Sequence, residues 1–213
     1  MDKRFDDIVV PMTNPSGAPV RDLVPGQFCG GRMKGFALVH LVEELAAIDA
    51  LDAWHATWPE PHRATLKRRN LSPGAWFPVE YYYHGAMFLA QRLGPLPRSA
   101  IDVGHRITRR DIGAFFRFLS SMASPPTVLS LASSFWRSYY DRSELHCTQV
   151  SDTSALLEIR GWPLLDDIIS LHELGGSFVA FNEACRAKDV RLTRLELTRP
   201  GHFTYALHWS PLP

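Results

Sequence analysis

The fold is decided by one stretch of the sequence, residues 135–161, which reads FWRSYYDRSELHCTQVSDTSALLEIRG. It starts with a helical pattern and changes to two short runs, Ser143–Val150 and Thr153–Gly161, separated by the turn residues Ser151 and Asp152. In the second run apolar residues occupy every other position, as in a strand with one buried face. The stretch therefore predicts a helix followed by a β-hairpin.

The chain continues with another helix and another hairpin. Leu164 to about Ala187 has helical spacing, and two strand-like runs follow, Val190–Thr198 and Phe203–Trp209, joined by the turn Pro200-Gly201. The apolar phase of the third run changes near Arg194, which predicts a β-bulge. The C-terminal half is therefore expected to form a four-stranded antiparallel sheet with a helix across it.

A glycine pair lies inside the second of these helices. Gly175 and Gly176 each lower helix stability by about 1 kcal/mol relative to alanine. A helix that keeps two glycines at this cost is expected to make a close contact or to kink there.

The residues before this half have helical patterns. Apolar positions recur at helical spacing from Phe36, and Pro78 is suited to the first turn of an aromatic-rich helix. Thr108–Asp111 has the form of a capping box, which predicts the start of a further helix, and Ser124-Pro125-Pro126 separates that helix from the next. The predicted fold class is α+β, an N-terminal helical layer packed on a four-stranded antiparallel sheet.

The chain is expected to hold one domain with an N-terminal extension. Residues 1–30 are punctuated by proline and glycine and are predicted to form an arm, in which Phe5–Val10 is a candidate edge strand. Residues 31–213 are predicted to form a single α+β domain, a size that suits one hydrophobic core.

The amino-acid composition limits the binding partners and the cellular compartment that we expect for the protein. A formal net charge of +1 gives no concentrated basic field, so neither nucleic acid nor an anionic membrane is an expected partner. The three cysteines are widely spaced and form no CxxC pair, which argues against a disulfide framework or a zinc ribbon. Neither a signal peptide nor a membrane-spanning run is apparent. We therefore expect a cytoplasmic protein.

Motifs for catalysis or metal binding are lacking in the sequence. There is no Gly-x-Ser-x-Gly nucleophile elbow, and His172-Glu173 lacks the second histidine of a zinc-binding HExxH helix because position 176 is glycine. We expect no catalytic residue, no metal site and no cofactor, and hence no enzyme. A small hydrolase or transferase that uses His172 or His202 stays as an alternative.

Several short motifs carry a resemblance to a known family. They are Lys34-Gly35, Trp76-Phe77-Pro78 with its aromatic-rich helix, Tyr139-Tyr140-Asp141, Gly161-Trp162-Pro163, and a closing strand that ends in Trp209. Over about residues 30 to 210 the chain resembles a paralogous family best known from myxobacteria. That family is similar to heme-nitric-oxide-binding domains, 4-vinyl-reductase-type sensor domains and Bet3-like subunits of Golgi transport complexes.

The resemblance implies a sensor-type domain, but two hallmarks of its relatives are missing. Heme-binding members use a helix histidine and a Tyr-x-Ser-x-Arg motif, and the segment Tyr140-Asp141-Arg142-Ser143 does not match that motif. Phenol-sensing members carry a cysteine cluster near the C-terminus, where this chain has Cys185 alone. The resemblance therefore implies the fold, a tendency to dimerise and an apolar ligand site between helices and sheet, without a cofactor.

Aromatic side chains are the candidate site. Eight of them crowd the C-terminal half, where they are expected either to form plain core or to line an apolar ligand pocket: Trp136, Tyr139, Tyr140, Trp162, Phe178, Phe181, Phe203 and Tyr205. Part of the set is also suited to a dimer or partner interface, where Tyr and Trp are enriched.

The function that we expect is a non-enzymatic small-molecule-sensing or protein-interaction module in bacterial regulation. Its expected partners are a second copy of the chain or another protein, with an apolar small molecule as a candidate ligand. A heme- or gas-binding sensor is the alternative.

Overall fold

A computed structural model describes residues 24–112, 125–164, 167–185 and 187–210. The candidate strand Phe5–Val10 and most of the predicted arm lie outside these ranges. Within the described residues no helix is long and apolar enough to cross a membrane.

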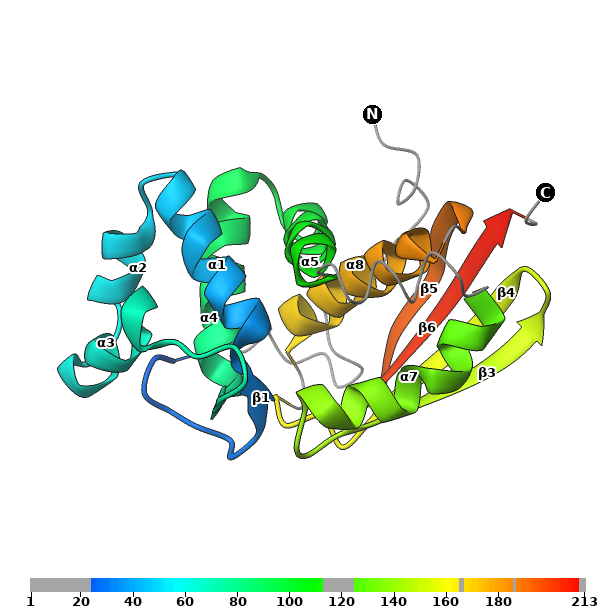
Figure 1. The fold of residues 1–213 in the computed structure, drawn as a ribbon, viewed down its shortest axis with the longest axis horizontal. Helices are drawn as coiled ribbons and strands as arrows, with labels where there is room; N and C mark the ends of the chain where they lie inside the picture. Colours follow the sequence, from blue (N-terminus) through cyan, green and yellow to red (C-terminus); the bar gives the residue numbers. More distant parts are fainter. Residues whose placement is uncertain (1–23, 113–124, 165–166, 186, 211–213) are drawn as a thin grey trace.

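The N-terminal part is a group of helices closed by a two-stranded sheet (Figure 1). Its elements in chain order are β1 (Arg32–Lys34), α1 (Gly35–Ala47), α2 (Leu51–Ala56), α3 (Glu60–Leu66), the 3₁₀ turn η2 (Arg68–Asn70), β2 (Trp76–Pro78), α4 (Val79–Leu93) and α5 (Arg98–Asp111). Strands β1 and β2 pair antiparallel, with Met33 opposite Phe77. The apolar stripe of α1 is buried as its spacing predicts, and Leu38, Leu41 and Leu45 are fully inaccessible.

The C-terminal part is a sheet covered on one face by two helices. Its elements are α7 (Pro125–Tyr139), β3 (Glu144–Ser151), β4 (Ser154–Arg160), α8 (Ile168–Ala184), β5 (Lys188–Arg199) and β6 (His202–Ser210). The strand order is β3-β4-β6-β5, and every neighbouring pair is antiparallel. The predicted α+β class is confirmed, with a helical part beside a four-stranded antiparallel sheet (Figure 1).

Of two local predictions about the sheet region, the bulge is confirmed and the start of the following helix is shifted. The β5–β6 register shifts between Leu192 and Arg194, at the predicted bulge. Helix α8 begins at Ile168, later than the expected Leu164, because the Asp167 side chain accepts hydrogen bonds from the amides of Ile169 and Ser170 at 3.0 and 3.1 Å. This N-cap satisfies two donors of the first turn and fixes where the helix starts.

One prediction about the helices is wrong. Thr108–Asp111 does not begin a helix but forms the last turn of α5, which starts at Arg98, and the rest of the helix predicted after it lies outside the described residues. Helix α5 is polar along most of its surface, and its buried apolar residues Ile101, Val103 and Ile107 end directly before these four residues. The apparent capping box is therefore a helix end in which Asp111 turns towards the interior.

Helices α5 and α8 cross at glycines. A Cβ atom added to Gly104 on α5 would lie 1.9 Å from the carbonyl oxygen of Glu173 on α8, and one added to Gly176 would lie 2.0 Å from the carbonyl oxygen of Ile101. These distances are far below van der Waals contact, so the two backbones touch without side chains between them. The close contact predicted for the Gly175-Gly176 pair is confirmed.

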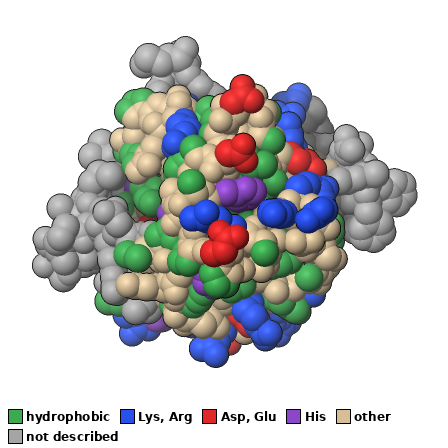
Figure 2. Space-filling model, turned by 90° about the vertical axis from the view of Figure 1, so that its left-hand side faces the viewer, with side chains coloured by type: hydrophobic (Ala, Val, Ile, Leu, Met, Phe, Trp, Pro, Cys, Tyr) green, Lys and Arg blue, Asp and Glu red, His purple; other side chains and the backbone are tan. Residues whose placement is uncertain are grey.

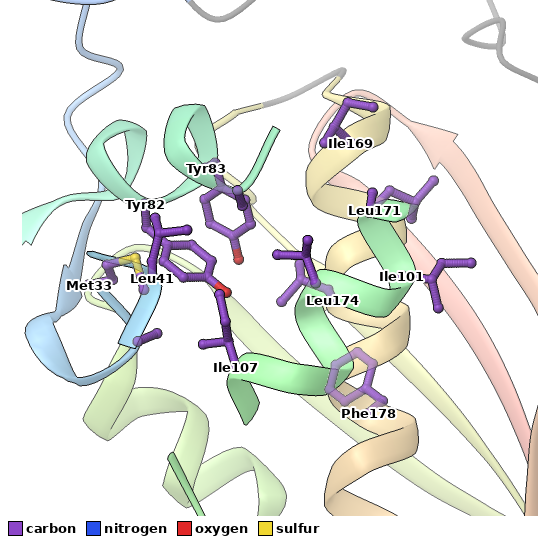
Figure 3. Close-up of a cluster of buried hydrophobic side chains, with 14 of the residues drawn as sticks. Met33, Leu41, Tyr82, Tyr83, Ile101, Ile107, Ile169, Leu171, Leu174 and Phe178 are labelled. Atoms are coloured by element: carbon purple, nitrogen blue, oxygen red, sulfur yellow. The ribbon is translucent and has the colours of Figure 1, made fainter. Parts of the chain in front are cut away.

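The core runs through both parts. Figure 3 shows Tyr82 and Tyr83 of α4 reaching towards α5 and α8, whose Ile107, Leu174 and Phe178 complete the cluster. On the surface at the helical end, Lys and Arg side chains are interspersed with Asp and Glu, and Figure 2 shows no continuous patch of one sign on that face.

Candidate functional site

A cavity of about 140 Å³ lies between α5, α7, α8 and the neighbouring strands β3 and β4. Small and aliphatic side chains line part of it, among them Ala37, Ala132, Leu145, Leu157 and Leu174. An engineered protein cavity of about 150 Å³ with similar apolar walls stays dry and binds benzene. The cavity therefore has the capacity for one six-membered ring.

The rest of the apolar wall is aromatic, and α7 and α8 supply it. The side chains are Phe135, Trp136, Tyr139 and Tyr140 from the α7 region, and Phe178 and Phe181 from α8. Trp136 stacks with Phe178 at a centroid distance of 6.2 Å and lies 4.3 Å from Tyr140. Its indole Nε1 donates a 2.9 Å hydrogen bond to Ser143 Oγ, which fixes the ring against the wall.

Two carboxyl groups form the acidic part of the lining, which also holds the polar side chains of Thr108, Ser177 and Asn182. Asp111 comes from the last turn of α5, and Glu173 comes from α8. Tyr82 Oη donates a 2.6 Å hydrogen bond to Glu173 Oε1, and Ser177 Oγ donates a 3.2 Å bond to the same oxygen. Glu173 Oε2 is buried and has no hydrogen-bond partner among the described residues. Asp111 Oδ1 is likewise buried without a hydrogen-bond partner, so two acceptors of the lining residues are unsatisfied, which is costly for buried polar atoms.

The two carboxyl groups hold their protons more tightly than usual. Burial, followed by the charge of Glu173, raises the pKa of Asp111 to about 8. Burial also raises the pKa of Glu173 to about 7, although its bond from Tyr82 works in the opposite direction. His40 of α1 approaches Asp111 from outside the lining, with Nε2 3.3 Å from Oδ1 but without hydrogen-bond geometry. In the described lining there is no lysine, arginine or histidine.

The structure divides the eight aromatic residues predicted from the sequence. Five of them line the cavity: Trp136, Tyr139, Tyr140, Phe178 and Phe181. Trp162, Phe203 and Tyr205 do not, and each is at most 1% exposed. Trp162 donates to Ser170 Oγ at 3.0 Å, and Tyr205 donates to the carbonyl of Leu171 at 3.0 Å, so these rings form the core beneath α8.

Sequence reasoning missed the polar members of the lining. Asp111 was assigned to a helix start, and Glu173 was considered only for its place beside His172. A signal was present for Glu173, since it lies between Leu171 and Leu174 on the apolar face of its helix. A charged residue on such a face is rarely buried without a specific environment.

Comparison with known proteins shows what this architecture resembles. No model of a known protein family matches the chain, and no curated protein sequence matches it. Solved structures do match. The unliganded Fe(II) H-NOX protein from K. algicida superposes with a TM-score of 0.62 at 8% identity, over 84% of this chain and 98% of that one. The fold is that of the H-NOX domains.

Other H-NOX structures agree. The S. oneidensis protein in its Fe(II)NO state matches with a TM-score of 0.57 at 10% identity, over 84% of this chain and 99% of that one. An oxygen-binding H-NOX domain related to soluble guanylate cyclases matches with a TM-score of 0.57 at 12% identity, over 84% and 96% of the two chains. At such identities the likeness itself establishes the fold.

The residues around the cavity do not fit a heme. A heme iron takes an axial ligand from histidine, cysteine, methionine or tyrosine. All nine histidines and all three cysteines of the chain lie in the described residues, and none of them lines the cavity. Tyr82, Tyr139 and Tyr140 do line it, but burial raises the pKa of all three phenols and disfavours a phenolate ligand. A porphyrin is also several times larger than a ring-sized cavity.

Proposed function

We propose that this H-NOX-fold chain is a non-enzymatic sensor domain that binds a small, ring-sized molecule directly in its central cavity. The observation that carries the proposal is the 140 Å³ space that aromatic side chains of α7 and α8 line. Apolar pockets with a few polar groups are the usual form of small-molecule sites. The ligand would contact both helices and the sheet at once, so its binding would change how they pack.

The biological setting is part of the proposal. A bacterial regulator that works in the cytoplasm as a homodimer or with a protein partner is consistent with the sequence expectations. The kinship with the myxobacterial family, the vinyl-reductase-type sensors and the Bet3-like subunits is likewise proposed. Native mass spectrometry of the purified chain would give its oligomeric state and the mass of any co-purified ligand.

A binding experiment with a simple probe tests the proposal. Toluene is titrated into the protein while the fluorescence of tryptophan is recorded, because Trp136 lies in the wall. We expect saturable binding that is lost in Ala132→Leu, which fills the cavity from α7. Ala46→Leu, on an exposed position of α1, is the matched control and should bind as the natural chain does. Absence of saturable toluene binding in the natural chain, with the protein folded, would refute the proposal.

Heme binding is the second candidate, and the H-NOX neighbours favour it. Reconstitution with heme followed by absorption spectroscopy distinguishes heme binding from binding of a ring-sized ligand. We expect no stoichiometric Soret band, since the cavity offers no imidazole or thiolate. A stoichiometric Soret band that Ala132→Leu abolishes would instead establish a heme site in the same cavity.

A further inference from the structure

We propose that the cavity selects an organic cation, an aromatic ring with a short ammonium arm, and that Glu173 is its counter-ion. This inference rests on the proposed function and specifies the chemical class of the ligand. It is carried by the juxtaposition of an unsatisfied buried carboxylate oxygen and aromatic side chains among the residues that line one cavity.

The first step is the state of Glu173. The residue is 2% exposed and lines the cavity. Tyr82 and Ser177 both donate to Oε1, whereas Oε2 has no donor among the described residues. Glu173 also has no ion pair in the described part of the chain. A ligand N–H directed at Oε2 would supply the missing hydrogen bond and the missing positive charge together.

The second step is the sign of the charge that the cavity would accept on a ligand. Glu173 and Asp111 are both acidic, and the described lining holds no basic side chain. Burial raises the pKa of Asp111 to about 8, so at neutral pH this side chain is mostly protonated and Glu173 is the counter-ion. His40 lies beside Asp111 but approaches it from outside the lining. An anionic ligand would therefore find no cationic side chain in the described lining, and a neutral ring would leave Oε2 unsatisfied. A cation would donate to Oε2 and stabilise the ionised form of Glu173.

The third step is the aromatic wall. Trp136, Tyr140 and Phe178 present ring faces and edges to the same space, with Trp136 and Phe178 nearly parallel at an interplanar angle of 26°. Aromatic faces attract ammonium groups, most strongly where water is excluded. The ring of the ligand is expected to pack among these side chains while its ammonium arm points to Glu173.

Four probes of nearly equal size test the inference: benzylamine, benzyl alcohol, toluene and benzoate. At neutral pH benzylamine is a cation and benzoate an anion. Titration calorimetry on the full chain should show benzylamine binding at least about tenfold more tightly than toluene. Benzyl alcohol should lie between these two, and benzoate should not bind.

Two variants locate the effect. Glu173→Gln keeps the shape and removes the charge, so it should weaken benzylamine binding at least about tenfold and change toluene binding less than about threefold. Glu144→Gln removes an exposed carboxylate of β3 and should leave all four affinities unchanged. If Glu173→Gln does not fold, the ranking of the four probes on the natural chain decides the question alone.

The outcomes separate this inference from the proposed function. Equal affinity for toluene and benzylamine, or an unchanged benzylamine affinity in a folded Glu173→Gln variant, would overturn the cation inference and leave the apolar sensor in place. Failure of both toluene and benzylamine to bind the natural chain would overturn both.

Discussion

Tyr82 on α4 donates a 2.6 Å hydrogen bond to Glu173 Oε1 on α8, and each residue is only 2% exposed. The bond links the helical part of the domain to a helix that lies on the sheet. The bond is made to Oε1, whereas Oε2 of the same carboxyl group has no hydrogen-bond partner among the described residues. A single buried contact therefore both joins two parts of the fold and sets the polarity of the candidate site.

Tyr82→Phe should destabilise the domain. The change removes a buried donor and leaves Oε1 with Ser177 alone, which should cost about 1–3 kcal/mol in the free energy of unfolding. Urea-induced unfolding measures this cost. Tyr139→Phe is the control, because no hydrogen bond of the Tyr139 hydroxyl is found among the described residues, and it should cost less. Equal effects of the two changes would contradict the role given to the Tyr82 bond.

Gly176→Ala should be more damaging than an ordinary glycine replacement. The new methyl group would meet the carbonyl oxygen of Ile101 at 2.0 Å, so α5 and α8 would have to separate. Overpacking of this kind costs about 1–3 kcal/mol or more. Gly74→Ala is the control because its added Cβ meets nothing within 4 Å. Thermal unfolding compares the two variants, and equal melting temperatures would show that the crossing is not rigid.

The buried carboxyl groups should make stability fall as pH rises. Burial raises the pKa of Asp111 from 3.8 to about 8, so the folded state keeps a proton that the unfolded chain has lost. The resulting stabilisation is complete below about pH 4 and is lost as pH rises through about 8. Other titratable side chains of the described residues interact electrostatically with Asp111 or Glu173. They are His40, Tyr82, Tyr83, Tyr139, Tyr140, Asp167 and Tyr205.

Asp111→Asn tests this dependence. Between about pH 5 and pH 8, the free energy of unfolding of the natural chain should fall relative to that of the variant by at least about 1.4 kcal/mol, the equivalent of one pKa unit. His84 and His172, whose pKa values burial lowers to about 4, contribute equally to both proteins and cancel in the difference. Parallel pH profiles would show that Asp111 does not stay protonated in the folded state.

Trp162→Phe should lower the stability of the fold without changing ligand binding in the cavity. Trp162 is fully buried and donates to Ser170, but it does not line the cavity. Its replacement should lower the free energy of unfolding by about 1–3 kcal/mol through the lost hydrogen bond and lost packing, with toluene affinity unchanged. Phe178→Leu, in the cavity wall, should change both quantities. A change in toluene affinity in Trp162→Phe alone would place the ligand elsewhere.

The C-terminal half could be predicted from the sequence because its signals are local. The alternation through residues 153–161 reports one buried sheet face, and the phase change near Arg194 reports the bulge. Helix α5 was mostly missed since it carries few apolar residues, and its burial against α8 depends on Gly104, which has no hydropathy signal. Local patterns therefore located the sheet but not the helix that crosses above it.

The candidate site was predictable only in part, for a related reason. Aromatic residues near one another in sequence, such as Trp136 and Tyr140, could be expected to share a wall. Asp111 and Glu173 come from different helices, and only the crossing of α5 over α8 brings them to one cavity. The packing of α8 on the sheet likewise determines which aromatic side chains belong to the core, and this tertiary contact leaves no local pattern in the sequence.

The glycine crossing gives Glu173 two tasks at once. Its carbonyl is the surface against which Gly104 rests, and its side chain carries the oxygen without a partner. No side chain separates the two backbones at this crossing. Helix α5 therefore packs directly against the residue that we propose as the counter-ion of the ligand. A ligand that displaces Glu173 would therefore also displace α5, whose last turn brings Asp111 to the same cavity.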